Sequence, residues 1–464
     1  MGNNRNNLKL KIMFCFALFA ATGCGDVKSW LSNEKYKGEQ ASAPEVTSNE
    51  FADDPAFKAA LVNTDYLTRS VNLRPWLDQG IHGRGRTIAI LDNGFAGLQS
   101  SLGKTLPPDL TVFKGPIDNE APTLHGTKLA EVIFALTSGS ADWSSTSRHP
   151  VIKLYNANGF SNFTAAVDQA INDKVDIIVY SQVWEFGGNF DGGGFINSAV
   201  NKATSAGILW INAAGNYASS SWQGPLVQNA DNTARLPFED KYVRLVVNEH
   251  ASPVKITLSW NDFADTKEWR TSRDLDLILL DKNGRELASG RKIQDGQDHG
   301  RDPSYSAHAR ESIDVELSPG IYLLRIDIRS RNFDLNSRLR ISANGPDVSF
   351  VDQATDASIM IPADNPNVLT VGASDDTASS YGRTATGLQK PEVVAPSIIQ
   401  FESGISFQGS SSAAAVAAAV IAVYQEVCGP VSRADIVQRI NSGALSQQSV
   451  KGLGLWLPSS LRCY

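Results

Sequence analysis

Four residues carry the side chains that an acyl-transfer reaction needs: a carboxylate, an imidazole, an amide and a hydroxyl. Asp92 ends the apolar run 87–91, and His125 starts an amphipathic stretch. Asn216 closes an Ala-Ala-Gly-Asn segment, and Ser411 opens an alanine-rich run. A base activates a hydroxyl nucleophile, a carboxylate orients the base, and an amide can stabilise the oxyanion. The residue types therefore predict Ser411 as nucleophile, His125 as general base, Asp92 as its orienting carboxylate and Asn216 as oxyanion donor.

Each of these residues taken alone also has an ordinary structural explanation. Ser411 could cap a packed alanine helix, and Asp92-Asn-Gly suits a turn after a strand. Asn216 suits a strand-to-helix turn. The chain has 6 histidines, and His125 alone begins a predicted helix of the strand–helix part. The ordered set of four, rather than any single member, predicts catalysis.

The segments around these residues alternate between predicted strands and helices. Strands are expected at 87–91, 151–155, 175–181, 208–213 and 368–372. Helices are expected from 125 and at 162–172, 195–205, 411–424 and 433–440. This alternation predicts an α/β fold with a mostly parallel sheet covered by helices on both faces. Sites in such sheets lie at the carboxyl ends of strands, where Asp92 and Asn216 are expected.

Residues 236–345 interrupt this alternation. Only strand patterns occur there, at 243–247, 254–260, 275–280, 313–317, 321–328 and 339–342, with turn signals such as Lys282-Asn283-Gly284 between them. The pattern predicts an inserted all-β domain, either a sandwich or a jelly roll. The α/β domain would then have two parts, 66–235 and 346–464.

The N-terminus has the features of an export signal. A positively charged start and a short apolar run, 12–20, precede Ala21-Thr22-Gly23-Cys24. The run is too short to span a membrane and typical of a signal peptide over 1–23. Because its end is similar to a bacterial lipobox, Cys24 is expected to carry a lipid anchor in the cell envelope. Ordinary signal cleavage with Cys24 as a bystander is the alternative.

Residues 24–65 are polar and predict a flexible tether. Of the 4 cysteines in the chain, Cys15 would leave with the signal. Cys428 and Cys463 then form an even pair, and an exported protein favours a disulfide between them over two unpaired thiols.

The composition is that of a globular protein without a nucleic-acid surface. The chain has 464 residues, is 42% hydrophobic and has a net charge of −7. Its Lys and Arg residues are scattered, so nucleic acid is not an expected partner.

The segments with the four residues resemble the conserved blocks of subtilases, the subtilisin-like serine peptidases. The similar segments are 90–94, 125–127, 213–216 and 409–411, with 371–373 and 394–396 resembling further family strands and turns. The resemblance implies a serine endopeptidase that acts on protein or peptide substrates and needs no cofactor for its chemistry. It also implies that Ser181, Gln182 and Val183 line the substrate cleft as an extended edge.

The chain departs from the family pattern at several positions. Ser410 stands where threonine is usual, and Ala415 where proline is usual. Lys128 and Glu131 replace a usual His and Gly, and residues 25–65 are too short for the usual folded propeptide. No departure removes a catalytic residue, but together they are compatible with low or narrow activity.

The insert resembles the β-sandwich attached to some large secreted subtilases. Asp262, Asp274 and Asp276 lie in the similar segments and could bind structural calcium through hard oxygen ligands. Alternatively they are solvated carboxylates that alternate with core leucines, and the period-two pattern favours this second explanation.

Two other functions are compatible with the sequence. A non-catalytic subtilase-like lipoprotein could bind a partner through its β insert. An esterase or other acyl hydrolase could use the same residues, although the blocks do not favour it.

Overall fold

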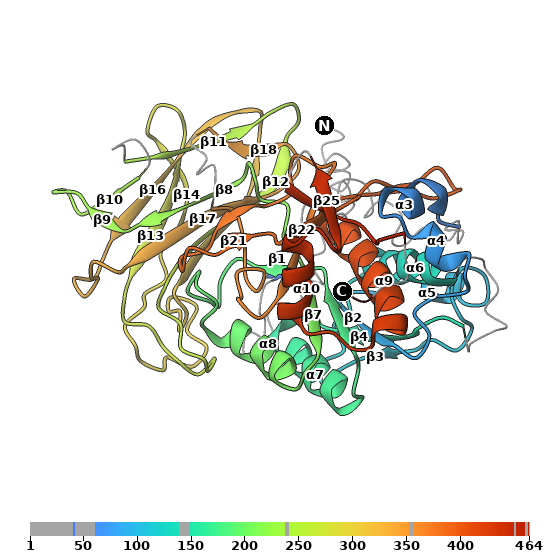
Figure 1. Cartoon of the computed structure of the whole chain (residues 1–464). Helices are drawn as coiled ribbons and strands as arrows, with labels where there is room; N and C mark the ends of the chain where they lie inside the picture. The colour runs from blue at the N-terminus through green and yellow to red at the C-terminus, as the bar shows by residue number, and fades with distance from the viewer. Residues whose placement is uncertain are drawn as a thin grey trace, which may run out of the picture.

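The computed structural model describes residues 40–41, 61–138, 148–236, 241–351, 357–449, 452–459 and 463 (Figure 1). The expected signal peptide, the lipid-carrying Cys24 and the tether apart from residues 40–41 and 61–65 lie outside the described residues.

The mostly parallel sheet expected from the sequence is confirmed. It has nine strands in the order β25-β26-β22-β19-β7-β5-β2-β4-β3. Neighbours from β26 to β3 run parallel, and β25 alone pairs antiparallel. The strands are β2 (Thr87–Asp92), β3 (Val112–Phe113), β4 (Val151–Asn156), β5 (Ile177–Tyr180), β7 (Leu209–Ala213), β19 (Leu369–Ala373), β22 (Val393–Ala395), β25 (Ser446–Ser449) and β26 (Gly452–Leu455).

Helices cover both faces of this sheet because its strands are apolar on both sides. In β2, Ile88 and Ile90 join one apolar cluster, whereas Ala89 and Leu91 join the other. The first cluster holds α3 (Thr64–Ser70), α4 (Arg74–Leu77), α5 (Leu98–Ser101), α6 (His125–Ser138), α9 (Ser410–Cys428) and α10 (Arg433–Asn441). The second holds α7 (Gly159–Asn172) and α8 (Phe195–Ser205).

The insert is a sandwich of two antiparallel sheets, to one side of the α/β part (Figure 1). Their orders are β14-β13-β16-β11-β18 and β15-β12-β17-β8. The strands are β8 (Ser221–Pro225), β11 (Val243–Val247), β12 (Ser252–Trp260), β13 (Leu275–Leu280), β14 (Glu286–Gly290), β15 (Arg310–Leu317), β16 (Gly320–Ile328), β17 (Arg338–Asn344) and β18 (Val348–Phe350). Because β8 pairs with β17 and β18 with β11, the sandwich sheets extend beyond the expected limits of 236 and 345.

The remaining strands are short. They are β1 (Gln40–Ala41), β6 (Val183–Trp184), β9 (Val227–Gln228), β10 (Ala234–Arg235), β20 (Gly382–Arg383), β21 (Gln389–Lys390), β23 (Ile399–Gln400) and β24 (Ser406–Phe407).

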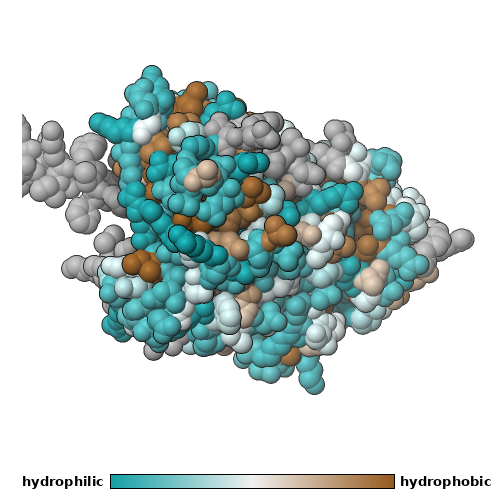
Figure 2. Space-filling view, turned by 90° about the vertical axis from the view of Figure 1, so that its left-hand side faces the viewer, coloured by the Kyte–Doolittle hydropathy of each residue, from teal (hydrophilic) through white to brown (hydrophobic). Residues whose placement is uncertain are grey.

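The insert packs directly on the α/β part. Phe195 of α8 lies 5.8 Å from the Phe263 ring and 5.6 Å from the His308 ring, measured between centroids. One apolar cluster therefore runs from α7 and α8 into the sandwich. The outer face of the sandwich is mostly hydrophilic, with smaller apolar areas between (Figure 2).

Helix α9 is the central helix of the α/β part. It packs against α6 and the strands β7 and β19. Its alanines are buried on all sides, so the helix can approach the sheet closely. Among the described residues α9 alone is long and apolar enough to cross a membrane, but 83% of its apolar window is buried in the protein. Its composition is thus explained by burial in the core.

The predicted disulfide between Cys428 and Cys463 is confirmed. Cys428 is the last residue of α9, and the two Cα atoms are 5.3 Å apart. Trp76 Nε1 donates to the Pro458 carbonyl oxygen at 2.8 Å, and Leu457 is fully buried. The C-terminal segment is therefore docked on the first helices of the α/β part.

Candidate active site

Asp92 and His125 form a buried hydrogen-bonded pair. Asp92 is the last residue of β2 and His125 the first of α6, so a strand end meets a helix start. The distance from His125 Nδ1 to Asp92 Oδ2 is 2.6 Å, and Asp92 is 0% exposed. An ionised carboxylate can only accept, so Nδ1 carries the proton and Nε2 remains the basic nitrogen. The pair has the geometry of a base with its orienting carboxylate.

Ser411 is the second residue of α9, where the backbone N–H groups are not bonded within the helix. Gly409 precedes the helix with φ +109°, a conformation that L side chains rarely adopt. The Ser412 hydroxyl donates to the Gly409 carbonyl oxygen at 2.8 Å. The Ser411 hydroxyl donates to the Ser181 carbonyl oxygen at 3.0 Å. The hydroxyl thus lies at a helix N-terminus, where developing negative charge is stabilised.

One dipeptide joins the serine to the histidine–aspartate pair. Ser181 contacts Ser411 through two hydrogen bonds, one in each direction. The side-chain nitrogen of Gln182 lies 3.3 Å from His125 Nδ1 and 3.5 Å from Asp92 Oδ2. Through this dipeptide the structure links Ser411 to His125 and Asp92 at the carboxyl edge of the sheet, where the sequence predicted Asp92 and Asn216.

Asn216 follows β7, and its amide orientation is fixed by Ser410. Its Oδ1 accepts hydrogen bonds from the Ser410 N–H and hydroxyl, both at 3.0 Å. The Ser410 hydroxyl in turn accepts from the Gly215 N–H at 3.0 Å. Because Oδ1 is occupied, the Nδ2 end faces Gly409, where an added Cβ would lie 2.6 Å away. A hydroxyl at position 410 is therefore what the site requires, and serine supplies it as well as threonine.

The expected substrate edge can pair with an extended strand. Val183 begins β6, which directly follows Ser181 and Gln182. Strand β1 pairs antiparallel with β6, with Ala41 opposite Val183. An extended segment of this chain thus already occupies the edge as a peptide would.

The departures in α6 form a buried ion pair. Lys128 Nζ lies 2.9 Å from Glu131 Oε2, and neither side chain is more than 3% exposed. Ser101 and Thr105 donate to the other carboxylate oxygen at 2.8 and 2.6 Å. Lys128 also lies 3.9 Å from the centre of the Phe401 ring. These two substitutions compensate each other, and they leave the start of α6 free to present His125.

Two of the three aspartates proposed to bind calcium have side-chain partners of their own, whereas Asp274 Oδ1 is buried without a hydrogen-bond partner among the described residues. Asp276 pairs with Arg329 at 2.5 Å, and Asp262 accepts from Thr271. Burial and the nearby Asp276 raise the pKa of Asp274 to about 6. Within the described part of the chain, no three His, Cys, Asp or Glu side chains converge as a metal site needs.

Sequence reasoning missed three contributors to the site. These are the Ser410 hydroxyl, the Phe407 ring, which packs edge-on to His125 at 5.5 Å, and Tyr217, which is fully buried beside Asn216. Ser410 was noted in the sequence as a departure from the family pattern, but its contact with Asn216 was not expected. The other two depend on tertiary packing that no local pattern reports.

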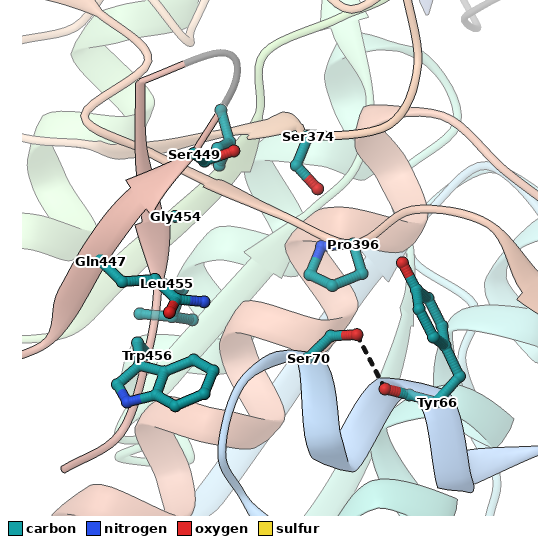
Figure 3. A pocket seen from close by; sticks show the side chains of 10 residues that line it. Tyr66, Ser70, Ser374, Pro396, Gln447, Ser449, Gly454, Leu455 and Trp456 are labelled. Carbon is teal, nitrogen blue, oxygen red and sulfur yellow. Dashed lines mark hydrogen bonds between the residues drawn. The ribbon is translucent and has the colours of Figure 1, made fainter.

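A separate pocket of about 250 Å³ lies further along the sheet edge, beyond the ends of β19 and β22. Figure 3 shows Tyr66 and Ser70 of α3 on one side of it and Gln447, Leu455 and Trp456 on the other. None of the four candidate catalytic residues lines this pocket.

The sequence of the chain is similar to that of a known protease. A curated relative, the thermostable alkaline protease of Halalkalibacterium halodurans, is 30% identical over 158 residues, which are 32% of this chain. The match spans 40% of the length of that relative.

Two solved structures match this chain, and the first is similar in fold. The CspB protease of Clostridium perfringens has a TM-score of 0.50 at 13% identity, covering 85% of this chain and 98% of that one. MycP1 of Mycobacterium smegmatis has a TM-score of 0.38 at 13% identity, covering 91% of this chain and 86% of that one.

The family described as "Subtilase family" (Peptidase_S8) matches residues 83–243 and 287–453, which together make up more than half of the chain. The matched segments contain Asp92, His125, Asn216 and Ser411. The chain is therefore a member of the subtilase family, with a β-sandwich inserted in its α/β fold.

Proposed function

We propose that this protein is a serine endopeptidase that hydrolyses peptide bonds through an acyl-enzyme on Ser411. The observation that carries the proposal is the buried 2.6 Å contact between His125 and Asp92 next to the Ser411 helix N-terminus. Membership of a peptidase family and the alkaline protease relative support it.

In the first half of the reaction, the Ser411 hydroxyl turns from the Ser181 carbonyl oxygen and attacks the scissile carbonyl carbon. His125 Nε2 takes the hydroxyl proton while Asp92 holds Nδ1–H. The new C–O bond produces an oxyanion, which Asn216 Nδ2 and the Ser411 N–H stabilise. Collapse breaks the C–N bond, and the amine leaves with the proton from His125.

In the second half, a water attacks the Ser411 ester. His125 takes a proton from the water, and the tetrahedral intermediate forms again at the same carbonyl. The C–O bond to Ser411 breaks, Ser411 regains its proton, and the carboxylic acid product leaves.

The test uses the three adjacent serines. Ser411→Ala should abolish hydrolysis of an unstructured protein such as casein, by about 10⁶-fold in kcat; that reference value comes from subtilisin, a protein of the same family. Ser412→Ala is the matched control, since it removes a neighbouring hydroxyl whose hydrogen bonds go to the backbone carbonyl oxygens of Gly409 and Ser397. Full activity of Ser411→Ala would contradict the role of Ser411 as nucleophile, and no activity in the wild type would support the scaffold alternative.

We also propose that the mature protein is anchored to a bacterial envelope membrane through a lipid on Cys24. The support is the short apolar run that ends at Ala21-Thr22-Gly23-Cys24. Cys24→Ser should move the protein from the membrane fraction to the soluble fraction. A wild-type protein that fractionates as soluble would contradict the anchor.

A further inference from the structure

We infer that the site accepts only a small residue, glycine, alanine or serine, on the acyl side of the cleaved bond. This inference rests on the proposed function, because it describes the substrate of that same site. Its basis is a group of three buried side chains, Val183, Tyr217 and Met360, which we call the acyl-side cluster.

The acyl residue of a substrate has to lie between two segments. Its carbonyl carbon must reach Ser411 Oγ, which is 3.0 Å from the Ser181 carbonyl oxygen, and its carbonyl oxygen must face Asn216. The α-carbon of this residue therefore lies between the edge 181–183 and the segment 213–217. Its side chain leaves either toward solvent or into the space between these segments.

That space is already filled. A Cβ added to Gly215 would meet both γ carbons of Val183 at 3.5 Å, which is ordinary van der Waals contact. Val183 is 1% exposed, and Tyr217 and Met360 behind it are 0% exposed. The gap between the two segments therefore has no room for a large side chain, whereas a methyl group needs little space.

The cluster is also held in place by polar contacts on its far side. The Tyr217 hydroxyl donates to Glu185 Oε1 at 3.3 Å. The sulfur of Met360 lies 3.4 Å from Nη1 of Arg340, a buried residue whose Nη2 donates to the Ile359 carbonyl oxygen at 2.6 Å. Because these partners are themselves buried, the cluster cannot easily move aside for a bulky side chain.

Backbone hydrogen bonds also hold the segments around the acyl residue in place. The Trp184 N–H donates to the Ile361 carbonyl oxygen at 2.6 Å, which ties the segment that carries Met360 to the substrate edge. The Tyr217 N–H donates to Ser380 Oγ at 2.9 Å, and the Ser380 N–H donates to the Gly215 carbonyl oxygen at 2.8 Å. The segment that carries Met360 is thus tied to the substrate edge, and the segment 213–217 is tied to Ser380.

The test measures labelling of Ser411 in the wild-type protein by three phosphonate probes. A fluorophosphonate with no amino-acid side chain tests the nucleophile alone. Two peptidyl phosphonates that differ only in their reactive residue, alanine or phenylalanine, test the cluster. We expect the general probe to label Ser411, and the alanine probe to react at least about 10-fold faster than the phenylalanine probe.

Variants then assign the effect to the cluster. Met360→Ala should raise the labelling rate of the phenylalanine probe about 10-fold or more and change that of the alanine probe little. Met360→Leu is the matched control, because it keeps the volume and should keep the preference for alanine.

The outcomes separate this inference from the proposed function. Labelling by the general probe with equal or faster reaction of the phenylalanine probe in the wild type would overturn the small-residue preference and leave the peptidase intact. No labelling of Ser411 by the general probe would overturn both.

Discussion

On one side of Ser411 lie three polar side chains: His125 Nδ1 donates to Asp92, and the Gln182 side-chain nitrogen lies within 3.5 Å of both. On the other side lies the acyl-side cluster, where apolar side chains fill the space and their polar contacts point away from the serine. The first arrangement can serve any acyl transfer, since it moves a proton whatever the substrate. The second, in the inference drawn above, selects among substrates. Catalytic power and specificity are therefore assigned to separate side chains, and mutations should separate them.

The largest effect is expected at Asp92, His125 and Gln182, which we call the proton-transfer side. Asp92→Asn should keep the fold but present His125 in the wrong tautomer, and kcat should fall about 10⁴-fold. The preference among probes of different size should stay, because the acyl-side cluster is unchanged. Measured kinetics that show a changed preference in this variant would break the separation of the two sides.

Lys128 supports the proton-transfer side from within α6. Lys128→Met should leave the Glu131 charge buried without its cation and lower the free energy of unfolding by about 3–5 kcal/mol. Denaturant titration measures this loss. Lys128→Met combined with Glu131→Gln should recover most of it, because a neutral amide still accepts from Ser101 and Thr105. If Lys128→Met alone were as stable as the wild type, the Lys128–Glu131 ion pair would not stabilise the fold.

Asn216 lies between the two sides. Asn216→Ala should lower kcat by about 100- to 1,000-fold with KM similar, the range known for an oxyanion donor in subtilisin, a relative of this chain. Ser410→Thr should retain activity, whereas Ser410→Ala should lose part of it because the amide is then held less firmly. Equal activity of both Ser410 variants would contradict the orienting role of the hydroxyl.

The smallest effect is expected from the hydroxyl of the acyl-side cluster. Burial and the neighbouring Glu185 carboxylate raise the pKa of Tyr217, so its hydroxyl remains a donor at neutral pH. Tyr217→Phe should lower the free energy of unfolding by roughly 1–3 kcal/mol, because Glu185 loses a donor. The ring still fills the site, so probe preference should not change. A shift toward large residues would show that the hydroxyl, not the ring, sets the preference.

Much of the proton-transfer side could be predicted from the sequence, and little of the acyl-side cluster could. Asp92 and His125 fall at a strand end and a helix start, positions that apolar periodicity locates. The Cys428–Cys463 disulfide was predicted from the number of cysteines and the expected export. Met360 lies in no recognisable motif and reaches the site only through tertiary packing. Strands β8 and β18 were missed for the same reason, since long-range pairing defines them.

The central claim is that Ser411 is an activated nucleophile, and one measurement tests it most directly. The purified wild-type protein is treated with a fluorophosphonate probe, digested, and analysed by mass spectrometry alongside His125→Ala. We predict a single adduct on Ser411 in the wild type and strongly reduced labelling in His125→Ala, because the hydroxyl then lacks its base. An adduct on Ser410 or Ser412, or equal labelling of both proteins, would contradict the account.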